Sequence, residues 1–165
     1  MRDAFTERRW TGLYGEYWVL TELAKRKVAA QRLCERLSGC DLITKDNILI
    51  EVKTSQAHLA RRDKGHWESR GWQFNSIRKT TTIHPDILVC IGLSDKVEFE
   101  VEHVWIMPTS ILIGKNKYGY KNNFNIKDTA YQRSHSPKPL LVSEKWIEKY
   151  EGKWEIILDY EKYKL

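Results

Sequence analysis

The chain has 165 residues, of which 41% are hydrophobic and 30% charged, a composition typical of one globular domain and not of a disordered or membrane protein. Its longest apolar run, residues 87–93, is much shorter than the roughly 20 residues of a membrane-spanning helix. Residues 1–10 hold no apolar segment of the kind found in secretory signals. The three scattered cysteines form neither a disulfide framework nor a zinc motif. We therefore expect a single domain over residues 1–165, in the cytoplasm and without membrane association.

The first half of the chain predicts a helix followed by a β-hairpin. Apolar residues recur at three- or four-residue spacing from Thr11 to about Lys25, which predicts an amphipathic helix. Residues 28–33 are compatible with either an extension of that helix or a short strand. Residues 41–44 and 48–55 then read as two strands around the polar break Lys45–Asn47, a pattern typical of a hairpin.

Further strands are predicted in the middle of the chain. Residues 56–70 are polar and basic and predict a loop, and Trp72–Phe74 predicts a short strand. Residues 86–93 form an apolar run typical of a buried strand, and residues 97–105 alternate between apolar and acidic side chains, as in a half-buried strand.

The last third of the chain is less regular. Pro108 predicts the start of a turn or helix that continues through residues 109–113, and residues 115–138 predict a loop. Residues 143–150 predict a short helix with Ser143 as its cap, and residues 154–158 predict a final strand. The sequence as a whole predicts a mixed α/β (α+β) fold.

The hairpin places charged residues together. With the three-residue loop 45–47, Asp41 lies across from Glu51 on the same face of the sheet. Facing carboxylates are about 4.5–5.5 Å apart at their Cβ atoms and repel each other, so a cation between them is expected. Mg²⁺ suits the site, because it binds through one or two carboxylates and keeps water and phosphate as its other ligands. Lys53 follows on the same face, where its ammonium can orient a water or neutralise a phosphate.

A third carboxylate, that of Glu16, lies on the apolar face of the predicted first helix, where a charged group usually has a partner or a task. Packing of this helix on the sheet would bring Glu16 towards the hairpin. Taken singly, each residue has an ordinary explanation: a solvated Glu-x-Lys strand face, an Asp at a strand start, a Glu at the margin of an apolar face. The interpretation as a site depends on the four residues in this order.

The ordered set resembles the PD-(D/E)xK phosphodiesterase superfamily, which includes type II restriction endonucleases, archaeal Holliday-junction resolvases and repair nucleases. The matching segments are Gly12–Leu20, Gly39–Thr44 and Ile48–Ser55, within a resemblance that spans about residues 11–93. Cys40 stands where the name of the motif has Pro. The resemblance implies a restriction-endonuclease-like central mixed β-sheet flanked by helices. It also implies metal on Asp41 and Glu51, a water-positioning Lys53 and, from the resolvase-like branch, a contribution from Glu16.

The expected function is therefore that of a Mg²⁺-dependent DNA endonuclease, with Mn²⁺ as a substitute for Mg²⁺. A homodimer is expected, because cutting both DNA strands requires two sites. The alternatives are a structure-specific nuclease for junctions or repair intermediates, a mobile-element nuclease, and an inactive nucleic-acid-binding module on the same fold. The net charge of +6 favours a polyanionic partner, and two basic blocks, residues 57–82 and 115–138, flank an acidic middle. The residues expected to contact nucleic acid in these blocks are Arg61, Arg62, Lys64, Arg70, Lys117 and Lys121.

Overall fold

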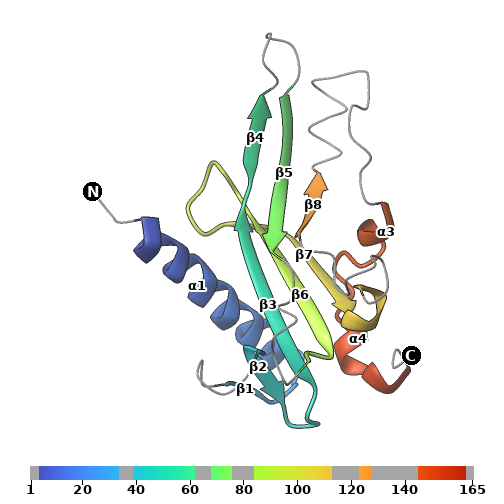
Figure 1. Ribbon diagram of the computed structural model, residues 1–165. Coiled ribbons are helices and arrows are strands. Elements are labelled where there is room, and N and C mark those ends of the chain that lie inside the picture. Colours follow the sequence, from blue (N-terminus) through green and yellow to red (C-terminus); the bar gives the residue numbers. More distant parts are fainter. Residues whose placement is uncertain are drawn as a thin grey trace.

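The computed structural model describes the chain in six stretches, residues 4–33, 39–61, 68–75, 84–112, 123–127 and 145–162. Two β-sheets and several helices make up the described part (Figure 1). In chain order the elements are α1 (Ala4–Lys25), β1 (Ala30–Arg32), β2 (Leu42–Thr44), β3 (Leu49–Gln56), β4 (His58–Arg61), β5 (Glu68–Asn75), β6 (Ile87–Leu93), β7 (Val101–Pro108), the 3₁₀ helix η1 (Thr109–Leu112), β8 (Asn123–Lys127), α3 (Lys145–Glu148), α4 (Glu155–Leu158) and the 3₁₀ helix η2 (Tyr160–Lys162).

The larger sheet has five strands in the order β1-β2-β3-β6-β7. It is mixed, because β3 and β6 pair in parallel whereas the other neighbours are antiparallel. One face packs on α1 and α4 through a core that includes Val19, Leu23, Ile50, Val52 and Ile156. A mixed sheet flanked by helices confirms the predicted fold class.

The opposite face of the larger sheet is covered by a second apolar cluster. Leu88 and Cys90 of β6 contribute to it, together with Trp72 and Phe74 of β5 and Ile147 of α3. Strand β5 belongs to a smaller sheet of three strands in the order β4-β5-β8. Strand β3 runs on into β4 after a single residue, so the strand that carries Glu51 links the two sheets (Figure 1).

The chain follows the predicted order of elements as far as β3. The hairpin has the predicted register, with Leu42 paired to Ile50 and Ile43 to Leu49. Helix α1 begins at Ala4, seven residues before the predicted start at Thr11. The open choice for residues 28–33 is settled as a strand, β1, because this segment pairs with β2.

Several predictions for the chain after β3 were wrong. The predicted loop 56–70 contains β4 and the start of β5, and the predicted loop 115–138 contains β8. The predicted strand 97–105 begins only at Val101, because residues 94–100 form a turn. The predicted last strand, 154–158, is helix α4, whose Ile156 and Ile157 are both buried in the core.

The remaining predictions are confirmed in part. The predicted strand Trp72–Phe74 is the centre of the longer β5, and the predicted helix 143–150 is confirmed as α3. Its proposed cap, Ser143, lies outside the described residues. Pro108 is the last residue of β7, and η1 follows it as the predicted turn or helix.

Candidate active site

The hairpin holds Asp41 beside β3. The backbone N–H of Asp41 donates a hydrogen bond of 3.0 Å to the carbonyl of Ile50, and Oδ2 of Asp41 accepts one of 2.7 Å from the N–H of Val52. Leu42 and Ile50 pair with each other, and both point into the core under α1. Because neighbouring residues of a strand point to opposite faces, Asp41 and Glu51 lie on the other face of the sheet. The two carboxylates are therefore neighbours on the sheet.

Glu51 lies in an environment that opposes its charge. Only 8% of its surface is exposed, and burial raises its pKa from the ordinary 4.5 to about 7. The negative charge of Asp41 acts in the same direction, Lys53 opposes the shift, and Glu16 adds a smaller unfavourable contribution. A bound cation would relieve this arrangement, because it would favour the ionised form of Glu51.

Lys53 lies on the same face of β3 as Glu51, two residues further along. Its Nζ forms an ion pair with Oε1 of Glu51, and 27% of the side chain remains exposed. Behind it, Lys53 pairs in register with Cys90 of β6, whose thiol is completely buried. The ammonium is thus anchored at the margin of the apolar cluster and still reaches solvent.

Glu16 reaches this region from α1. The helix approaches β3 closely at Gly15, where an added Cβ would lie 1.9 Å from Oγ1 of Thr54. Although Glu16 is near enough to influence the pKa of Glu51, its Oε2 accepts a hydrogen bond of 2.6 Å from Nε of Arg32. Glu16 therefore has a resident cationic partner.

Arg32 was not predicted from the sequence. It lies on β1, and its guanidinium lies 5.2 Å from the ring centre of Tyr17 while it pairs with Glu16. The sequence is compatible with either a helix or a strand for residues 28–33, so the spacing of the residues could not show where Arg32 lies. Only the pairing of β1 with β2 brings this cation towards the carboxylates.

Two residues next to the charged group have structural roles. Burial, together with the charges of Glu51, Asp41 and Asp86, raises the pKa of the Cys40 thiol to about 12, so Cys40 stays protonated and is not a nucleophile at neutral pH. Asp86 accepts hydrogen bonds from the N–H of Leu49, at 2.8 Å, and from the hydroxyl of Tyr160, at 2.9 Å. Asp86 thereby fixes the start of β3.

The carboxylates suit a metal held by few protein ligands. Among the described residues, no three His, Cys, Asp or Glu side chains gather closely enough to form a metal cluster. The donor set offered on this face is the pair Asp41 and Glu51. Mg²⁺ usually binds through one or two carboxylates and keeps several waters as its other ligands, so this pair suits it. Direct ligation by Glu16 stays a prediction.

The basic residues predicted to contact nucleic acid fall into two groups. Arg70 is 6% exposed, forms ion pairs of 2.6 Å with Asp95 and Glu102, and lies 5.2 Å from the ring centre of Trp72. These contacts give Arg70 a structural role, and its surroundings do not favour a contact with nucleic acid. The remaining predicted contacts, the side chain of Arg61 and residues Arg62, Lys64, Lys117 and Lys121, lie outside the described part of the structure.

Comparison with known proteins identifies the fold. No family model matches the sequence, and no curated protein matches it either. The structure is similar to that of a bacterial homing endonuclease, I-Ssp6803I, with a TM-score of 0.59 and 16% sequence identity over 97% of this chain and 94% of that one. The chain therefore has an endonuclease-like α+β fold along almost its whole length.

No described helix is both long and apolar enough to cross a membrane.

Proposed function

We propose that this chain is a metal-dependent DNA endonuclease of the PD-(D/E)xK type, which hydrolyses phosphodiester bonds. The observation that carries the proposal is the placement of Asp41, Glu51 and Lys53 on one face of the β2–β3 hairpin, with Glu51 buried beside a like charge. The endonuclease-like fold supports it. A buried carboxylate beside a second one lowers the stability of a fold without a cation, so its presence favours a functional role.

Each residue has a distinct role in this proposal. Asp41 and Glu51 would hold Mg²⁺, or Mn²⁺ in its place, and the metal when bound would supply a more acidic water and positive charge near the phosphate. Lys53 orients the attacking water and faces the negative charge that grows on the phosphoryl oxygens. Glu16 assists from α1, through direct ligation or through a water. Arg32 holds the carboxylate of Glu16 in place.

The similarity to a homing endonuclease also bears on the biological role. Of the three nuclease roles compatible with the sequence, restriction, repair of junctions and mobility of a genetic element, it favours the mobile-element nuclease. DNA is then the substrate. The alternative that is not an enzyme is an inactive nucleic-acid-binding module, and cleavage assays distinguish it from the endonuclease.

The decisive experiment compares two lysines of the same hairpin. Lys53→Ala should lower the cleavage rate about a hundred- to a thousand-fold, because it removes one group that stabilises transition-state charge, while DNA affinity stays nearly unchanged. Lys45→Ala is the matched control, since Lys45 is exposed at the turn and should cut like the wild type. Plasmid DNA, a synthetic four-way junction and RNA serve as substrates, each with Mg²⁺, with Mn²⁺ and with chelator.

Each result has a clear consequence. Wild-type cleavage by Lys53→Ala would remove the proposed catalytic role. Equal losses of binding and cleavage would make Lys53 a phosphate anchor only. A wild-type protein that binds DNA but cuts none of the substrates with either metal would favour the inactive module.

A further inference from the structure

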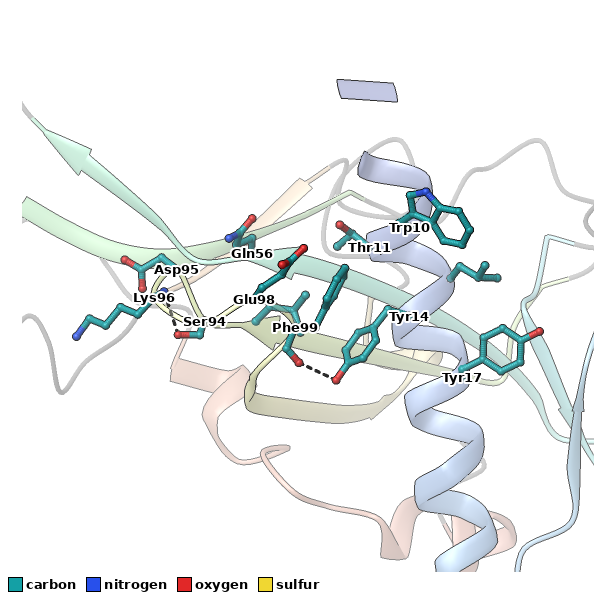
Figure 2. Close-up of a pocket in the computed structure, with 12 residues that line it drawn as sticks. Trp10, Thr11, Tyr14, Tyr17, Gln56, Ser94, Asp95, Lys96, Glu98 and Phe99 are labelled. Carbon is teal, nitrogen blue, oxygen red and sulfur yellow. Dashed lines mark hydrogen bonds between the residues drawn. The ribbon is translucent and has the colours of Figure 1, made fainter. Parts of the chain in front are cut away.

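A cavity of about 960 Å³ lies between the first half of α1 and the turn that follows β6. Trp10, Tyr14 and Tyr17 of the helix and Phe99 of the turn are among its lining residues, and Figure 2 shows Tyr14 pointing from the helix towards Phe99. Trp10, Leu13 and Tyr17 recur every three or four residues and form an apolar stripe on α1, beside Tyr14, which also packs against the core. We call this stripe together with residues 94–100 the α1–turn surface.

Exposed apolar side chains gather on this surface. Five large hydrophobic residues are exposed among those the structure describes, and four of them belong to the α1–turn surface: Trp10 at 57%, Tyr17 and Val97 at 53%, and Phe99 at 36%. The fifth, Leu158, lies on α4. Trp10, Tyr17 and Phe99 line the cavity, and Val97 lies in the same turn as Phe99. Scattered exposed apolar residues are ordinary, whereas such a concentration is typical of an interface.

The turn is held in the conformation that forms this surface. The hydroxyl of Tyr14 donates a hydrogen bond of 2.7 Å to the carbonyl of Phe99, and the two ring centres are 4.8 Å apart. Phe99 has a φ of 58°, in the left-handed region that non-glycine residues rarely adopt. A strained residue persists only where its surroundings fix it. The surface is therefore formed before any partner arrives.

The charges of the α1–turn surface disfavour nucleic acid and suit a copy of the same chain. Asp95 is paired with Arg70, but exposed Glu98 and Glu100 still outnumber Lys96 in the turn, and carboxylates repel a phosphate backbone. On the helix, exposed Arg9 precedes Trp10. A surface with a cation at one end and carboxylates at the other is self-complementary, because a two-fold axis brings each end against the opposite end of the partner.

We propose that the α1–turn surface binds a second copy of this chain in a two-fold symmetric homodimer. The need for two copies rests on the proposed function, since two antiparallel DNA strands call for two catalytic sites related by a two-fold axis. The interface and the candidate active site share α1. Tyr17 lines the cavity and also lies under the guanidinium of Arg32, the partner of Glu16.

The test is the mass of the full chain in solution, measured by sedimentation equilibrium. The wild type should have about twice the chain mass of 19.6 kDa. The double variant Trp10→Ser, Val97→Ser should raise the dissociation constant about 30-fold or more, because removal of a central aromatic anchor typically has at least that effect. Leu158→Ser is the matched control and should remain dimeric. Circular dichroism checks that all three chains are folded.

Plasmid cleavage separates the two proposals. The double variant should still nick one strand, since it keeps Asp41, Glu51 and Lys53, but it should produce linear DNA at least tenfold more slowly than the control. A wild type that is monomeric with and without DNA, or a double variant that stays as dimeric as the control, would overturn the proposed interface. If the wild type is a dimer that the double variant dissociates and no chain cuts DNA, the interface stands and the nuclease proposal fails.

Discussion

Replacing Glu51 by Gln should stabilise the metal-free protein and abolish cleavage at the same time. Gln keeps the approximate shape of the side chain but removes a charge that burial and Asp41 disfavour. The pKa of Glu51 is about 7 in the folded chain and 4.5 in its ordinary state, and each unit corresponds to 1.36 kcal/mol. The ionised side chain therefore lowers the free energy of unfolding by about 3 kcal/mol above neutral pH.

The sign of the pH dependence follows from proton binding. Between pH 4.5 and 7 the folded chain holds the Glu51 proton and the unfolded chain has released it, so the stability of the wild type falls as pH rises through this window. Glu51→Gln has no such proton. Its advantage should be about 3 kcal/mol at about pH 8, should shrink to roughly 1 kcal/mol at about pH 5, and should vanish below pH 4.5.

Urea unfolding in the presence of chelator measures this difference. Exposed Asp46→Asn, at the turn of the hairpin, is the control and should change the free energy of unfolding by less than about 0.5 kcal/mol. Added Mg²⁺ should stabilise the wild type by mass action but not Glu51→Gln. A Gln variant that is less stable than the wild type at about pH 8 would show that the ion pair with Lys53 fully compensates Glu51, and the argument for a cation at this position would fail.

Three further changes test the surroundings of the site. Gly15→Ala should lower the free energy of unfolding by about 1–3 kcal/mol in urea, because its Cβ would lie 1.9 Å from Oγ1 of Thr54; wild-type stability would contradict the close approach of α1 to β3. Arg70→Met should cost about 2–4 kcal/mol by the same assay, through loss of its ion pairs, and leave DNA affinity unchanged; weaker binding at full stability would instead place Arg70 on the DNA. Charge reversal at Arg61 and Arg62 should reduce the salt dependence of DNA binding, since each neutralised phosphate contributes roughly 0.9 to the log–log slope; an unchanged slope would exclude both from the backbone contacts.

The hairpin could be predicted from the sequence because its determinants are local. A three-residue polar break fixes the loop, and the period of two in β3 fixes which residues share a face. The placement of Asp41 across from Glu51 follows from these two facts, and the observed pairing of Leu42 with Ile50 confirms the register. The central part of the candidate site thus needs no information from distant parts of the chain.

Elements fixed by distant contacts could not be predicted in the same way. The segment 154–158 is apolar enough for a strand, yet it forms helix α4, in which Trp154, Ile156 and Ile157 are all buried in the core under the large sheet. The alternation of residues 97–105 is likewise interrupted, since the contact of Tyr14 with Phe99 stabilises a turn there. The local order of apolar and polar residues predicts neither the burial of α4 in the core nor the contact of Tyr14 with Phe99.

The charges around β3 argue that this region was shaped by function rather than by stability. The charges of Asp41 and Glu16 both act on Glu51, while Lys53 is paired with Glu51 and Arg32 with Glu16. If the group were a stabilising network, its cations would hold the pKa of Glu51 below the ordinary value, as Lys25 and Arg26 do for Glu22 on the surface of α1. The pKa of Glu51 is raised instead, first by burial and then by the charge of Asp41, so the ion pair with Lys53 does not offset these two effects. We propose that a further cation offsets them, with Lys53 beside it to act on what that cation brings.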